Sequence, residues 1–138
     1  MALKRILLDT NAYAAFKRGE PAIVELLRVP DEIHMSTVVL GELLSGFAVG
    51  KREARNREEL AEFLASARVV ITPVDEETAA AYARVYALLR RRGRPIPVND
   101  LWIAATALQH GLILVSLDEH FQAVDGLVTV TTPSQLLP

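Results

Sequence analysis

The chain has 138 residues, of which 51% are hydrophobic and 23% charged, with a formal net charge of −2 and no cysteine. This length suits one hydrophobic core, so we expect a single domain over residues 1–138. The lack of cysteine excludes disulfides, thiolate metal sites and cysteine nucleophiles, which leaves carboxylates, hydroxyls and three histidines for any chemistry. The near-neutral charge argues against a protein that holds nucleic acid by bulk positive charge.

The sequence predicts a soluble cytoplasmic protein with no membrane partner. No apolar run approaches the roughly 18 residues that a membrane-spanning helix needs. The first ten residues are not patterned as a signal peptide, because Asp9 interrupts their apolar run.

Short apolar runs alternate with segments of helical periodicity along the chain. In chain order, the expected elements are a strand at 5–8, two helices between 11 and 29, a weak strand at 32–35, helices at about 37–47 and 51–67, a strand at 69–71, helices at about 75–92 and 100–110, and strands at 112–115 and 127–130. Apolar strands that alternate with helices are typical of a parallel sheet covered on both faces. We therefore predict a three-layer α/β/α sandwich with a central parallel sheet.

Two of the carboxylates directly follow predicted strands. Asp9 and Asp118 each come just after an apolar run, and open parallel sheets bind ligands beyond the carboxyl ends of their strands. Aspartate is also favoured at turns and helix caps, so each residue taken alone has an ordinary structural explanation.

Two further carboxylates stand beside apolar residues. Asp100 lies in the first turn of a predicted helix that Asn99 is expected to cap, and it heads a stripe of small and apolar residues. Glu42 has valines and glycine as its neighbours at helical spacing. An exposed glutamate opposite a partner-binding face is the alternative for Glu42, since burying an unpaired charge is costly.

A bound metal ion would remove the cost of bringing these acids together. We call Asp9, Glu42, Asp100 and Asp118 the acidic quartet. Converging carboxylates without cysteine or a histidine pair favour Mg²⁺ or Mn²⁺ over zinc. A doubly wound sheet could unite the four residues, although they are far apart in sequence.

Four segments stand out when taken in order: LLDTN at 7–11, GEL at 41–43, NDLWIAA at 99–105 and LVSLDEHF at 114–121. Together they resemble the PIN domain, and most of all the VapC toxins of type II toxin–antitoxin systems. The resemblance covers essentially the whole chain. It implies a metal-dependent endoribonuclease that hydrolyses RNA phosphodiester bonds, with a cognate antitoxin as partner and a homodimer as its state.

Carried over residue by residue, the resemblance makes the acidic quartet the catalytic, metal-binding set, with Asp118 its least secure member. Ser116 stands where the family often has threonine, which keeps the hydroxyl. We expect Thr10, Asn11, Asn99 and Ser116 to orient a ligand carboxylate, a water molecule or a phosphate oxygen. Helix capping is the alternative role for Thr10 and Asn99.

Other functions and roles stay open from the sequence. A PIN-like module that binds RNA or a partner without cutting is one alternative function, and a receiver-like phosphoacceptor domain is another. The three histidines are expected to be structural because they are not spaced as a ligand pair, although His120 could lie near the site. Residues 90–92 and Arg94 could contact RNA phosphates or complement a helix end. Trp102 and Phe121 are expected in the core.

Overall fold

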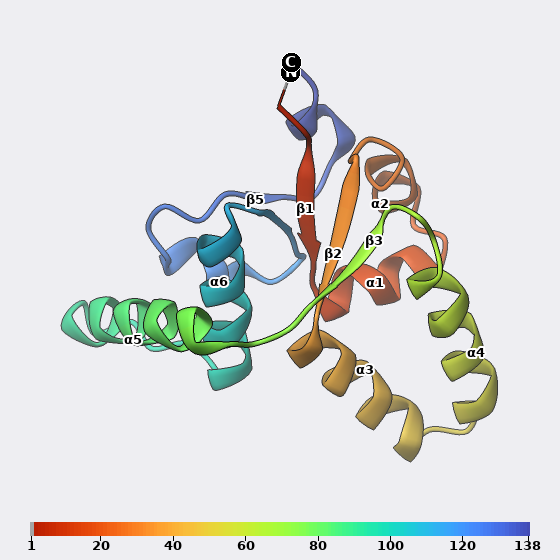
Figure 1. Cartoon of the computed structure of the whole chain (residues 1–138), viewed down its shortest axis with the longest axis horizontal. Helices are drawn as coiled ribbons and strands as arrows, with labels where there is room; N and C mark the ends of the chain where they lie inside the picture. The colour runs from red at the N-terminus through yellow and green to blue at the C-terminus, as the bar shows by residue number, and fades with distance from the viewer. Residues whose placement is uncertain (1) are drawn as a thin grey trace.

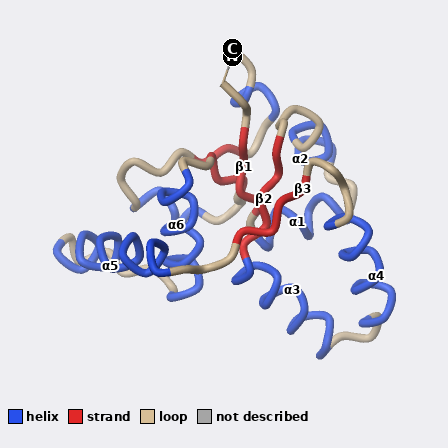
Figure 2. The backbone as a smooth tube through the Cα atoms, in the orientation of Figure 1, coloured by secondary structure: helices blue, strands red, loops and turns tan. Residues whose placement is uncertain are grey.

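The computed structural model describes residues 2–138, and its centre is an all-parallel five-stranded sheet in the order β3-β2-β1-β4-β5. Figure 2 shows the short strands enclosed by helices. The strands are β1 (Arg5–Leu8), β2 (Glu32–Ser36), β3 (Val69–Thr72), β4 (Ile113–Val115) and β5 (Thr129–Val130). The strand order reverses at β1, so the crevice between the carboxyl ends of β1 and β4 is the place where such sheets bind ligands.

The helices cover both sides of the sheet. They are α1 (Thr10–Lys17), α2 (Pro21–Leu26), α3 (Thr37–Val49), α4 (Glu53–Leu64), α5 (Glu76–Arg91) and α6 (Val98–His110), with 3₁₀ turns η1 (Glu119–Ala123) and η2 (Pro133–Leu136). In Figure 1, α1 to α4 lie on one side of the sheet and α5 and α6 on the other. The predicted three-layer sandwich is confirmed. Within residues 2–138, no helix is both long and apolar enough to cross a membrane.

The core is centred on β1, which pairs with both β2 and β4. Its Ile6, Leu7 and Leu8 are fully buried, and Leu8 is in register with Val115 of β4. Phe121 of η1 is also fully buried, as the sequence predicted. Because of this register, the residues that follow β1 and β4, Asp9 and Ser116, lie side by side.

The helix α6 is held against α5 by polar and aromatic contacts. Asp75 caps α5 in a reciprocal capping box and also accepts a hydrogen bond from Nε2 of Gln109 at 2.8 Å. Trp102, which is half-buried rather than fully in the core, stacks on Tyr82 with ring centroids 4.2 Å apart. These contacts fix α6 and thereby the position of Asp100 in its first turn.

Two local predictions need correction. Asn99 does not cap α6: the extended backbone of Pro97 forms the N-cap and the helix starts at Val98, which puts Asn99 inside the first turn. Leu112 precedes β4 rather than belonging to it. The strand predicted at 69–71 is present as β3, which lies at the edge of the sheet, where Ile71 is 48% exposed.

Candidate metal centre

Asp9 is a buried carboxylate at the end of β1. It caps α1, accepting a hydrogen bond from the amide of Thr10 at 2.9 Å, and it accepts a second from Oγ of Ser116 at 2.7 Å. Burial, together with smaller effects of the charges of Asp100 and Glu42, raises its pKa to about 6 against these two hydrogen bonds. Within residues 2–138, no lysine or arginine forms a salt bridge with it. A cation would therefore stabilise its ionised form.

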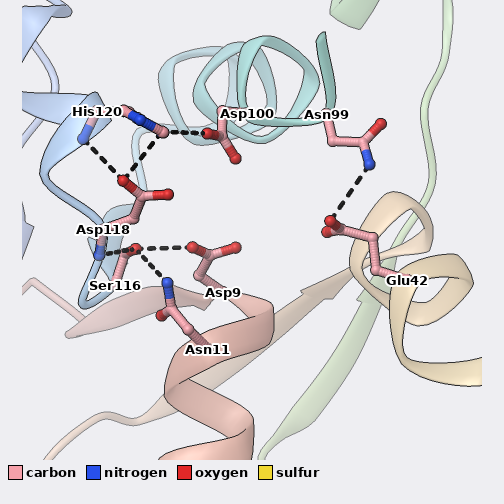
Figure 3. Close-up of polar contacts among 8 residues, drawn as sticks. All are labelled: Asp9, Asn11, Glu42, Asn99, Asp100, Ser116, Asp118 and His120. Atoms are coloured by element: carbon pink, nitrogen blue, oxygen red, sulfur yellow. Dashed lines mark hydrogen bonds and ion pairs between the residues drawn. The ribbon is translucent and has the colours of Figure 1, made fainter. Parts of the chain in front are cut away.

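Asp100, Asp118 and His120 form a compact group beside Asp9, which we call the outer triad. Each offers one ligand atom, and the three atoms lie within 4.8 Å of one another. Nδ1 of His120 is 3.0 Å from Oδ2 of Asp100 and 3.1 Å from Oδ1 of Asp118 (Figure 3). Asp118 also caps η1 by accepting a hydrogen bond from the amide of His120 at 2.9 Å. The 3₁₀ turn thus places the imidazole against both acids.

The electrostatics of the outer triad follow from burial and pairing. Burial raises the pKa of Asp100, opposed by its hydrogen bond with His120. That same hydrogen bond raises the pKa of His120, and the neighbouring Asp118 adds to the effect. Within residues 2–138, His120 is the one basic side chain that pairs with these acids, and its imidazole is positively charged when protonated.

Glu42 faces the outer triad from α3, on the opposite side of the site (Figure 3). Oγ1 of Thr10 donates to its Oε1 at 2.8 Å, and Nδ2 of Asn99 donates to its Oε2 at 3.3 Å. It is half-buried and hydrogen-bonded, so the alternative of a freely exposed glutamate is wrong. Its charge raises the pKa of both Asp9 and Asp100, which shows that it shares their electrostatic environment.

The neutral residues predicted to support the acids all lie at the site. Ser116 joins Asp9 to the outer triad, because its Oγ donates to Asp9 and accepts from the amide of Asp118 at 3.0 Å. Nδ2 of Asn11 donates to the same oxygen at 3.4 Å, while its Oδ1 accepts from the amide of Leu117 at 3.0 Å. The remaining two predicted residues, Thr10 and Asn99, hold Glu42 as described.

The donor set fits a divalent cation. It consists of carboxylate oxygens and one imidazole nitrogen, which hard or borderline divalent ions accept as ligands. The buried carboxylate of Asp9, which forms no salt bridge with any described residue, gives an independent reason to place positive charge here. The site is therefore a candidate divalent-metal centre.

The remaining candidates from the sequence divide between structural and site-adjacent positions. His34 is structural, since Nδ1 of its buried ring is 2.8 Å from Oγ1 of Thr72. Arg92 pairs with Asp125 at 2.6 Å. Arg94, by contrast, lines a surface groove of about 640 Å³ that begins at His120. The histidine spacing gave no sign of the outer triad, because His120 pairs with Asp100, 20 residues away.

Comparison with known proteins identifies the family. The PIN domain family matches residues 6–127, so the chain belongs to the PIN domain family. It is 32% identical to Ribonuclease VapC5 of Mycobacterium tuberculosis over 90% of each chain. The resemblance stated from the sequence is confirmed, and the receiver-like alternative is wrong.

Solved structures agree with this placement. A chain of VapBC2 from Rickettsia felis, solved bound to a promoter DNA fragment, superimposes with a TM-score of 0.82 at 25% identity, covering 91% of this chain and 97% of that one. A chain of DNA-bound VapBC from Salmonella typhimurium gives 0.82 at 26% identity, with 94% and 98% covered. Together with the sequence relative, they make the chain a PIN-domain protein similar to the VapC ribonucleases.

Proposed function

We propose that the chain is a metal-dependent endoribonuclease, the toxin of a toxin–antitoxin pair, that uses the acidic quartet for catalysis. The observation that carries the proposal is the convergence of four carboxylates at the carboxyl ends of β1 and β4 and on the helices α3 and α6. Membership of the PIN domain family and similarity to proteins named ribonucleases support this reading.

The quartet would hold Mg²⁺ or Mn²⁺. When bound, such an ion supplies Lewis acidity that activates water and neutralises charge on the phosphodiester. Asp9 would hold it from the end of β1 and Asp100 from α6. Asp118 would hold it from the start of η1, and Glu42 from α3. We propose all four as ligands.

The other side chains of the site have defined positioning roles. Ser116 keeps one oxygen of Asp9 in place, and Thr10 and Asn99 each fix one oxygen of Glu42. Because they leave the quartet preorganised, little reorganisation is needed when a ligand binds. Arg94 lies on the groove that adjoins His120, where it would meet a phosphate of the RNA backbone.

The proposed partners are an antitoxin protein and a second copy of this chain. Structural relatives are VapBC toxin–antitoxin assemblies, some of them bound to DNA. Apolar side chains that face solvent on and after β3, namely Val70, Ile71 and Val74, offer surface that a protein partner could cover. We propose that the protein acts in the cytoplasm, where both RNA and an antitoxin are accessible.

Expression in cells tests the proposed function against the non-catalytic alternative. Wild-type protein should arrest growth and generate new RNA 5′ ends, whereas the Asp100→Asn variant should do neither at equal abundance. Co-expression of the protein encoded by a short adjacent reading frame should restore growth. Growth arrest by the variant equal to that by wild type, with no new RNA ends, would favour a PIN-like module that binds without cutting.

A further inference from the structure

We infer that His120 is a direct ligand of the divalent cation, binding through Nδ1 alongside the carboxylates of Asp100 and Asp118. The inference rests on the proposed function, because it adds a nitrogen donor to the same metal centre. It changes the centre from an all-oxygen site into a mixed nitrogen and oxygen site.

Nδ1 of His120 is spaced from both acids as a metal ligand would be. Neighbouring ligands in an octahedral shell with bonds of about 2.1 Å lie about 3 Å apart. Nδ1 of His120 is 3.0 Å from Oδ2 of Asp100 and 3.1 Å from Oδ1 of Asp118. Nδ1 of His120 therefore already has the separation of an adjacent ligand from each of the two carboxylates, and all three donor atoms lie within 4.8 Å of one another.

The imidazole of His120 is held beside the acids by the turn that carries it. The backbone amide of His120 donates to Oδ1 of Asp118. The 3₁₀ turn therefore fixes the position of the His120 backbone relative to the carboxylate of Asp118. The next residue, Phe121, is fully buried and anchors the turn to the core. The ring itself is half-exposed while Asp100 is mostly covered, so His120 closes the solvent side of the triad.

A nitrogen donor affects which ion the centre prefers. Imidazole nitrogen suits first-row transition ions, whereas Mg²⁺ prefers oxygen ligands and keeps several waters. A site with one nitrogen donor should therefore discriminate in favour of Mn²⁺ over Mg²⁺. Removal of His120 should weaken Mn²⁺ binding by about 10-fold, the lower end of the loss seen when groups around a metal are removed, and should change Mg²⁺ binding much less.

Pulsed electron paramagnetic resonance of tag-free protein loaded with Mn²⁺ tests the inference. The wild-type spectrum should contain nitrogen modulation from a directly bound imidazole, which should change on ¹⁵N-histidine labelling. His120→Ala and His120→Asn should bind Mn²⁺ without this signal, the asparagine oxygen standing near the Nδ1 position. Glu119→Gln, which alters the neighbouring exposed residue of η1, should retain the signal and the wild-type Mn²⁺ affinity.

The outcomes separate this inference from the proposed function. Wild-type protein that binds Mn²⁺ and cleaves RNA without a nitrogen signal would overturn the inference and leave the nuclease intact. A signal that persists in His120→Ala would also overturn it. A histidine-dependent signal in a protein that cleaves no RNA would support the ligand and contradict the function. Failure of wild-type protein to bind Mn²⁺ would overturn both.

Discussion

Oγ of Ser116 donates a 2.7 Å hydrogen bond to Oδ2 of Asp9, which joins residues 107 positions apart at the ends of neighbouring strands β4 and β1. The same oxygen accepts from the amide of Asp118 at 3.0 Å. One hydroxyl therefore connects the buried Asp9 to the segment that carries Asp118 and His120. The sheet register brings the ends of the site together, and this hydroxyl sets the orientation of the carboxylate.

Ser116→Ala should weaken metal binding by about 10-fold, because the carboxylate of Asp9 loses the donor that orients it. The variant should also lose about 1 kcal/mol of unfolding free energy, since a buried hydrogen bond disappears. Isothermal titration with Mn²⁺ and urea unfolding measure the two effects. Ser116→Thr retains the hydroxyl and should remain within about threefold of wild type in metal affinity. Equal losses in both variants would show that packing, and not the hydroxyl, matters at this position.

Asp9→Asn should abolish RNA cleavage and yet stabilise the metal-free protein at pH 7.5. Burial raises the pKa of Asp9 from 3.8 to about 6, so ionising this carboxyl in the folded state is unfavourable by up to about 3 kcal/mol. The amide has no charge to desolvate and should recover part of that energy. Urea denaturation in the presence of a chelator gives the difference. A variant less stable than wild type under these conditions would contradict the conclusion that the ionised carboxylate of Asp9 destabilises the metal-free protein.

The stability of the metal-free wild-type protein should fall as pH rises through the pKa of Asp9. The folded state binds this proton more tightly than the unfolded state, so the stabilisation is fully present below pH 3.8 and is lost as pH passes about 6. Asp9→Asn should not show this component. Unfolding free energies between pH 4.5 and 7.5, compared between wild type and variant, measure it. Parallel profiles for the two proteins would mean that Asp9 does not titrate in this range.

Metal affinity should change in the opposite direction over the same range. A ligand carboxyl must lose its proton to bind the cation, so the contribution of Asp9 to Mn²⁺ affinity should rise by up to tenfold per pH unit below about 6 and level off above it. Calorimetric titrations at several pH values test this. An affinity that stays constant from pH 5 to 7 would argue that Asp9 is not part of the metal centre.

Thr10→Val should lower kcat for RNA cleavage by about tenfold while leaving the fold intact. Thr10 is half-buried, and its hydroxyl makes the 2.8 Å hydrogen bond to Oε1 of Glu42, so valine removes this contact with little change of shape. Thr10→Ser retains the donor and serves as the matched control. Single-turnover cleavage assays distinguish the two. If serine is as damaging as valine, the methyl group rather than the hydroxyl supports the site.

The sequence was sufficient to predict the sheet, its layers and the four acids, because those features depend on local patterns. Asp9 and Asp118 follow apolar runs, and strand ends are easily read from such runs. The contacts between distant elements could not be predicted in this way. The local sequence around Asn99 does not show that Pro97 is the N-cap of α6. With Pro97 in that role, the side-chain amide of Asn99 is free to reach Glu42.

The edge position of β3 and the contact between His120 and Asp100 were not predicted, for the same reason, although the sequence indicated that His120 could lie near the site. An apolar run indicates a strand but not whether the strand lies at the centre or the edge of a sheet, so the exposure of Ile71 depends on strand order. His120 meets Asp100 only because η1 packs against α6. The spacing of residues along the sequence does not predict that contact.

The most direct test of the central claim is cleavage of purified RNA by the purified protein, followed with Mn²⁺ present, after chelation, and after Mn²⁺ is restored. The account predicts cleavage that stops with chelator, returns with the metal, and is absent in the Asp100→Asn variant under all three conditions. Cleavage that continues at the same rate in chelator, or that the variant performs as well as wild type, would contradict the assignment of a metal-dependent ribonuclease to the acidic quartet.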